Sequence, residues 1–123
     1  MMPLPQVSRR PTPAEGPPSV AVFTLVPGPD HPAFAGHFPG DALLPAVVQV
    51  DWAVRLGQMA FGPLGAFQGL DRVKFLRPVR PGTGLELRLS LEAGDAASAR
   101  LRFQYQDAAG KVSSGTVLFQ DLP

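Results

Sequence analysis

The sequence of 123 residues contains no cysteine, which excludes a disulfide framework, a thiolate metal site and a cysteine nucleophile. It has no apolar run near the roughly 20 residues of a membrane-spanning helix, and prolines occupy the place of a signal peptide's apolar core. An excess of one charge is also missing, because 11 basic and 10 acidic residues give a net charge of +1. We therefore expect a cytoplasmic protein that neither spans a membrane nor binds nucleic acid.

The composition of the chain changes near residue 19. Residues 1–18 contain six of the 15 prolines and no periodic apolar pattern, which predicts a disordered tail without a function of its own. Residues 19–123 alternate apolar runs with turns. Because a chain of this length supports a single core, we expect one domain here.

The order of the predicted elements defines the fold class. Residues 19–26 are apolar and β-branched and predict a strand, and residues 45–61 are apolar almost all round and predict a buried helix that begins with Pro45. Strand-like runs follow at residues 66–79, 85–91, 98–106 and 112–119. No βαβ unit occurs, so we expect an α+β fold with one antiparallel sheet wrapped around a central helix. A sheet of this size leaves an edge exposed, which predicts a homodimer joined edge to edge.

The loop before the helix contains residues that are suited to acid–base chemistry. It reads Gly36-His37-Phe38-Pro39-Gly40-Asp41, and Asp51 follows His37 by fourteen residues (51 minus 37). The stretch GHFPGDALLPAVVQVDW resembles the signature of the hotdog-fold 3-hydroxyacyl-(acyl carrier protein) dehydratases, and RVKFLRPVRPG at residues 72–82 resembles a downstream strand of that family. The resemblance covers residues 19–121 and is strongest to the small dehydratase-like proteins of aryl-polyene and related pigment clusters.

This resemblance implies that the chain converts 3-hydroxyacyl thioesters on an acyl carrier protein to trans-2-enoyl thioesters, with no cofactor and no metal. His37 is then the base, and Asp51 protonates the leaving hydroxyl. The substrate-binding positions are Phe38, Pro39, Gly40, Ala46 and Val47. The N–H groups of the last two open the helix and are placed to receive the thioester oxygen. In this family the histidine of one subunit faces the carboxylate of the other, so activity requires a dimer.

A basic cluster follows the helix. Four of the 11 basic residues fall within nine positions: Arg72, Lys74, Arg77 and Arg80. Two interpretations stay open, a docking site for an acidic acyl carrier protein or a solvated sheet edge without a partner.

Two other functions also stay open. A hotdog thioesterase would use Asp51 to activate water for attack on the thioester. A non-catalytic protein that binds the acyl carrier is suggested by Ala46, which stands where the dehydratase family has glycine. Arg55, four residues after Asp51, is also spaced for an ordinary ion pair along the exposed side of the helix.

Overall fold

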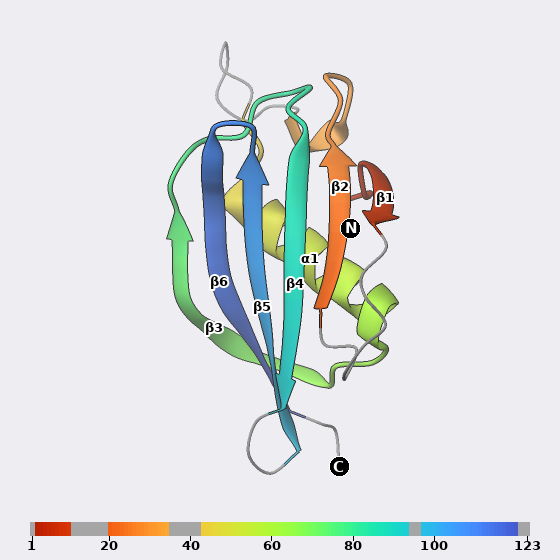
Figure 1. Cartoon of the computed structure of the whole chain (residues 1–123), viewed down its shortest axis with the longest axis vertical. Coiled ribbons are helices and arrows are strands. Elements are labelled where there is room, and N and C mark those ends of the chain that lie inside the picture. Colours follow the sequence, from red (N-terminus) through yellow and green to blue (C-terminus); the bar gives the residue numbers. More distant parts are fainter. Residues whose placement is uncertain (1, 11–19, 35–42, 94–96, 121–123) are drawn as a thin grey trace.

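The computed structural model describes residues 2–10, 20–34, 43–93 and 97–120 (Figure 1). The elements in chain order are β1 (Gln6–Arg10), β2 (Val20–Val26), a 3-10 turn (Pro32–Phe34), α1 (Ala46–Phe61), β3 (Ala66–Phe75), β4 (Leu85–Ala93), β5 (Ser98–Asp107) and β6 (Gly110–Gln120). No helix in these ranges is both long enough and apolar enough to cross a membrane.

All the strands form one antiparallel sheet in the order β1-β2-β4-β5-β6-β3, and α1 lies across one face of it (Figure 1). Strand β2 pairs with β4 although α1 and β3 lie between them in the chain, so the connections on both sides of the helix run back to the same sheet. The predicted α+β architecture, with one sheet around one helix, is confirmed.

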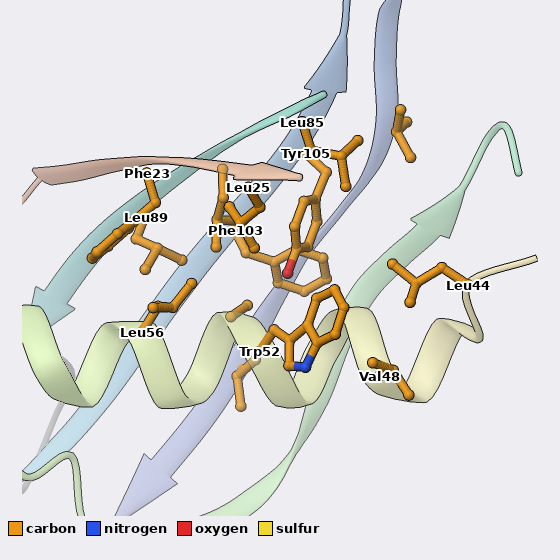
Figure 2. Close-up of a cluster of buried hydrophobic side chains, with 14 of the residues drawn as sticks. Phe23, Leu25, Leu44, Val48, Trp52, Leu56, Leu85, Leu89, Phe103 and Tyr105 are labelled. Carbon is orange, nitrogen blue, oxygen red and sulfur yellow. The ribbon is translucent and has the colours of Figure 1, made fainter. Parts of the chain in front are cut away.

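The core lies between α1 and the inner face of the sheet. Trp52 and Leu56 of α1 pack against apolar side chains of the central strands, among them Leu89 and Phe103 (Figure 2). Leu85, Leu87 and Leu89 alternate with exposed or half-exposed residues along β4, as a half-buried strand requires. Burial of these side chains supplies the main stabilisation of the fold.

The first strand corrects the prediction of a disordered tail. Residues 6–10 form β1 and pair with β2, so that prediction is wrong for this part of the chain, whereas residues 11–18 lie outside the described residues. The side chains of Met2, Leu4 and Val7 pack against the core. Main-chain pairing and three scattered apolar contacts order the segment, although its sequence shows no periodic pattern.

Two predicted boundaries can be compared directly. The helix was expected over residues 45–61 and is observed over Ala46–Phe61, where Pro45 is the extended residue that precedes the first turn. Strand β3 ends at Phe75 rather than at residue 79. The strand stops before Pro78, which has no N–H for pairing with a neighbouring strand.

A β-bulge interrupts β3 opposite Gly115 of β6. The pairing register shifts between Asp71 and Lys74, and Arg72 adopts a left-handed backbone conformation with φ of 52°. A Cβ atom at Gly115 would lie 2.8 Å from Val73 Cγ2 and 2.9 Å from Phe103 Cε2. Gly115 therefore makes room for the Val73 side chain inside the bulge.

We predict that Gly115→Ala destabilises the protein by about 1–3 kcal/mol, because the added methyl group overpacks a site bounded by a branched side chain and a buried ring. Gly69→Ala in β3 is the matched control, since nothing lies within 4 Å of a Cβ atom at that position. Urea denaturation of both variants measures the difference. Equal midpoints for the two variants would contradict this account of Gly115.

Candidate active site

Asp51 lies on α1, and its side chain is 39% exposed. Arg55 Nη1 lies 3.4 Å from Asp51 Oδ2, so the ion pair expected from the four-residue spacing forms. The same Arg55 nitrogen donates a hydrogen bond to the Met2 carbonyl at 2.5 Å. The carboxylate of Asp51 is therefore accessible, has one cationic neighbour, and stands beside the N-terminal segment.

The first turn of α1 presents two N–H groups without acceptors. The N–H groups of Val48 and Gln49 both donate to the Pro45 carbonyl, at 3.1 and 3.2 Å. Pro45 offers no side-chain cap, and within the described part of the chain the N–H groups of Ala46 and Val47 have no partner. These donors lie at the positive end of the helix dipole, where an oxyanion is stabilised.

A buried hydrogen-bond network holds this end of the helix on the sheet. Ser113 Oγ of β6 donates to Gln49 Oε1 at 2.7 Å, and the Tyr105 hydroxyl of β5 donates to the Gln49 carbonyl at 2.7 Å. Gln49 Nε2 lies 3.4 Å from the Leu44 carbonyl, and the Leu44 N–H donates to the Val79 carbonyl at 2.8 Å. Leu44, two residues before the helix begins, is thus held through both of its backbone groups.

Tyr105 stays protonated in this network. Burial raises the pKa of the Tyr105 hydroxyl far above its usual range, and the negative charge of Asp51 raises it further. Figure 2 shows the hydroxyl oxygen pointing toward α1. The Tyr105 hydroxyl therefore stays un-ionised near neutral pH and donates to the Gln49 carbonyl of the helix.

Sequence reasoning missed this network. The helix was expected to be apolar almost all round, yet it contains the polar Gln49, which is 3% exposed, and its partner Ser113 is fully buried. The sequence did contain a signal for this network: Gln49 is polar but lies outside the exposed side of the helix that contains Asp51 and Arg55. Buried polar side chains are nearly always hydrogen-bonded, so such a residue predicts a partner on the facing sheet.

The predicted base and its loop cannot be placed. His37, Phe38, Pro39, Gly40 and Asp41 all lie outside the described residues.

The other histidine, His31, has a structural role in the described part of the chain. Its Nδ1 accepts the Ala33 N–H at 3.0 Å, so Nε2 carries the proton and donates to the Pro3 carbonyl at 2.9 Å. The ring also meets the Trp52 indole edge to face, with the ring centroids 5.2 Å apart. His31 thereby ties the N-terminal segment to the helix.

The basic cluster is divided by the fold. Arg77 donates to Asp107 Oδ1 at 2.5 Å and to the carbonyls of Gly110 and Lys111, so it holds the β5–β6 hairpin. The hydrogen bond from Arg77 keeps the pKa of Asp107 below its usual range. The other members, Arg72, Lys74 and Arg80, are exposed, and Arg72 lies in the bulge of β3.

The architecture defines the class of protein: one antiparallel sheet packed on one central helix is the hotdog fold. A zebra fish thioesterase superfamily member 2 has a TM-score of 0.68 over 92% of this chain, at 12% identity, and shows the fold alone.

The chain belongs to the ApeI-like dehydratase family, whose model matches residues 15–116. The dehydratase heterocomplex ApeI:P from Xenorhabdus doucetiae contains a chain with a TM-score of 0.72 and 25% identity, which covers 98% of this chain and 99% of its own length. An uncharacterised protein from Erwinia carotovora subsp. atroseptica has a TM-score of 0.68 and 25% identity, over 98% of this chain and 97% of its own.

Curated relatives match a shorter stretch. The 3-hydroxyacyl-[acyl-carrier-protein] dehydratase FabZ of Haemophilus influenzae is 39% identical over 70 residues, which are 50% of this chain and 47% of the relative. FabZ of Thermomicrobium roseum is 35% identical over 69 residues, 50% of this chain and 46% of its own. The match thus spans about half the length of these curated relatives.

We predict that Ser113→Ala costs about 1–3 kcal/mol of stability, because it leaves the buried Gln49 Oε1 without its donor. Ser114→Ala is the matched control, since Ser114 lies on the other face of β6 and is partly exposed; its effect should stay within about 0.5 kcal/mol. Denaturant unfolding measures both. A similar small effect for the two variants would show that the network is not stabilising.

Proposed function

We propose that the chain is an enzyme that dehydrates 3-hydroxyacyl thioesters carried on an acyl carrier protein, in the cytoplasm, in fatty acid or aryl-polyene-type biosynthesis. Its membership of the ApeI-like dehydratase family and its likeness to FabZ dehydratases support this reaction. The single observation that carries the proposal is that α1 carries both an accessible carboxylate, Asp51, and two N–H donors at its first turn that have no partner among the described residues.

The reaction divides between these groups. His37 removes the proton from the carbon next to the thioester carbonyl, and the N–H groups of Ala46 and Val47 stabilise the negative charge that develops on the carbonyl oxygen. The electron pair then forms the new carbon–carbon double bond as the bond from C3 to the hydroxyl breaks. Asp51 enters this step in its protonated form and gives its proton to the departing hydroxyl, which leaves as water. The proton that His37 took up then returns to the carboxylate, so both groups are restored and the only net product besides the enoyl thioester is water. Phe38, Pro39 and Gly40 line the path of the substrate in this proposal.

Ala46 is compatible with this role. Glycine stands at the corresponding position in the family motif, and alanine adds a methyl group but keeps the N–H. The residue is exposed, so the methyl group does not compete with a packed neighbour. The thioesterase alternative gains no support from the zebra fish structure, because that likeness is confined to the fold.

We predict that His37→Ala and Asp51→Asn each lower turnover by about a hundredfold or more, as expected for the loss of an acid or base. Mass spectrometry of a 3-hydroxyacyl carrier protein measures the loss of water. Asp30→Asn, an exposed aspartate outside the proposed site, is the control and should retain wild-type activity. Release of free thiol would indicate a thioesterase, and carrier binding without turnover would indicate a non-catalytic homologue.

The exposed cations near β3 are proposed to dock the carrier protein. The candidates are the exposed side chains of Arg72, Lys74 and Arg80. Arg77 is only partly exposed, and its guanidinium bonds within the β5–β6 hairpin. Acyl carrier proteins are acidic, so exposed cations on β3 and in the segment after it favour their association beside the proposed dimer edge.

The dimer is proposed to form through β3. The other sheet edge, β1, is short and carries Ser8, Arg9 and Arg10, which discourage strand addition. Edge strand β3 is ten residues long, and four large apolar side chains are exposed on it or just after it: Phe67, Leu70, Phe75 and Leu76. Such a strand is stabilised by pairing with a second chain.

We predict that the wild-type chain is a homodimer with twice its 13.0 kDa mass, and that Leu70→Lys shifts it toward the monomer, because a charge on the edge strand opposes pairing. Light scattering after size exclusion measures the mass. Gln6→Lys on the β1 edge is the control and should remain dimeric. A monomeric wild type would contradict the homodimer and favour assembly with a different chain, as in the Xenorhabdus doucetiae heterocomplex.

A further inference from the structure

The outer face of the sheet, opposite α1, contains a groove of about 520 Å³. Four arginines from three strands line it: Arg72 of β3, Arg88 of β4, and Arg100 and Arg102 of β5. We call it the arginine groove. Successive side chains of a strand point to opposite faces of the sheet. The neighbours of Arg88 in β4 and of Arg102 in β5 are buried in the core, so these two arginines point to the outer face.

The groove is hollow because short side chains lie between long ones. Ser90 pairs with Arg102 across β4 and β5, and Thr116 pairs with Arg102 across β5 and β6. Ser114 lies two residues from Thr116 on the same face of β6, opposite Gln104. The short side chains form the floor and add hydroxyl groups, and the arginines form the walls.

The charge in the groove is strongly asymmetric. Four arginines and one acid, Asp71, line it, so its charge is +3, whereas the whole chain carries +1 and the rest of it therefore carries −2. Arg102 reaches Glu92 at 3.3 Å in an exposed ion pair. In the described part of the chain, Arg72, Arg88 and Arg100 have no acidic partner. Like charges held this close repel one another, and an anionic ligand relieves the repulsion.

The position of Arg72 is set by a strained backbone. Its φ of 52° is unfavourable for a residue with a side chain. The bulge turns Val73 over Gly115 and leaves Arg72 beside Asp71 in the wall of the groove. Strain of this kind concentrates at functional sites, where it directs a side chain.

The lining favours a small anion over a protein partner. Protein interfaces have apolar or aromatic centres, whereas the only large apolar residue in this lining, Phe103, is 2% exposed. The volume falls in the range of small-molecule sites, about 300–1,000 Å³. Guanidinium groups bind phosphate through paired hydrogen bonds, and hydroxyl and amide groups supply further donors.

We propose that the arginine groove binds a small ligand that carries at least two linked phosphate groups, as in a nucleoside diphosphate or the diphosphate of a coenzyme. The groove lies on the face of the sheet opposite the helix that carries Asp51. The groove shares Arg72 with the proposed carrier-docking cations, but it contains neither Asp51 nor a residue of the first turn of α1. Binding of a diphosphate and dehydration of the thioester are therefore separate measurements, and either one can fail without the other.

The test is a titration of the full chain with inorganic pyrophosphate, followed by calorimetry and by NMR of the backbone amides. We expect saturable binding with shifts centred on Ser90, Gln104 and Thr116, and weaker binding when salt rises from about 50 to about 200 mM. The double variant Arg88→Gln/Arg100→Gln should weaken binding by about tenfold or more, because two charge-assisted contacts are lost. Both arginines are exposed and make no ion pair among the described residues, so the variant should keep the wild-type melting temperature.

Lys111→Gln is the control for loss of a positive charge outside the groove, and it is compared with each single variant, Arg88→Gln and Arg100→Gln, because Lys111 is exposed in the β5–β6 hairpin and does not line the groove. It should bind pyrophosphate as the wild type does. ADP and coenzyme A, titrated in parallel, distinguish the two sources of a diphosphate. The proposal is overturned if pyrophosphate does not saturate the protein, if sulfate binds equally well, or if the double variant binds unchanged. Binding of a hexaglutamate peptide without binding of pyrophosphate would instead assign the groove to an acidic protein.

Discussion

The hydrogen bonds of buried Gln49 are the contact on which the arrangement of the site depends. Apolar packing between α1 and the sheet is strong but non-directional, so by itself it allows the helix to slide or rotate. Ser113 and Tyr105 meet Gln49 through its side chain and its carbonyl, from two different strands. Because unpaired polar groups are costly in the core, a shift of the helix that broke these bonds would be unfavourable. These hydrogen bonds therefore fix the position of the first turn of α1 and of Asp51 relative to the sheet.

The two faces and the two edges of the sheet differ in the residues that they present. Its inner face packs on α1 and thereby supports the candidate acid, whereas its outer face gathers arginines around a groove. The β1 edge is short and charged, and the β3 edge is long and apolar. A catalytic side, an assembly edge and an anion-binding face can therefore coexist on a small domain, because the residues of each alternate along the same strands.

Much of the fold could be predicted because it follows from local patterns. The apolar run after Pro45 and the alternation in residues 85–91 and 98–106 depend only on the periods of helix and strand. Strand β1 was missed because it is ordered by pairing with β2 rather than by a pattern of its own. Arg77 was grouped with docking residues because its neighbours are basic, although the fold turns it toward Asp107, thirty positions away.

By itself, the sequence determined the types of the helix and of the strands from residue 20 onward, the helix start after Pro45 and the fourteen-residue spacing between His37 and Asp51, since these are properties of neighbouring residues. Only the tertiary structure decided that Gln49 is buried and that arginines from β3, β4 and β5 line one groove. Strand order and register bring distant residues together, and a bulge such as that at Arg72 redirects a side chain. Periodicity along a chain specifies which face a residue occupies, but the strand that will lie beside it is selected by packing of the whole sheet.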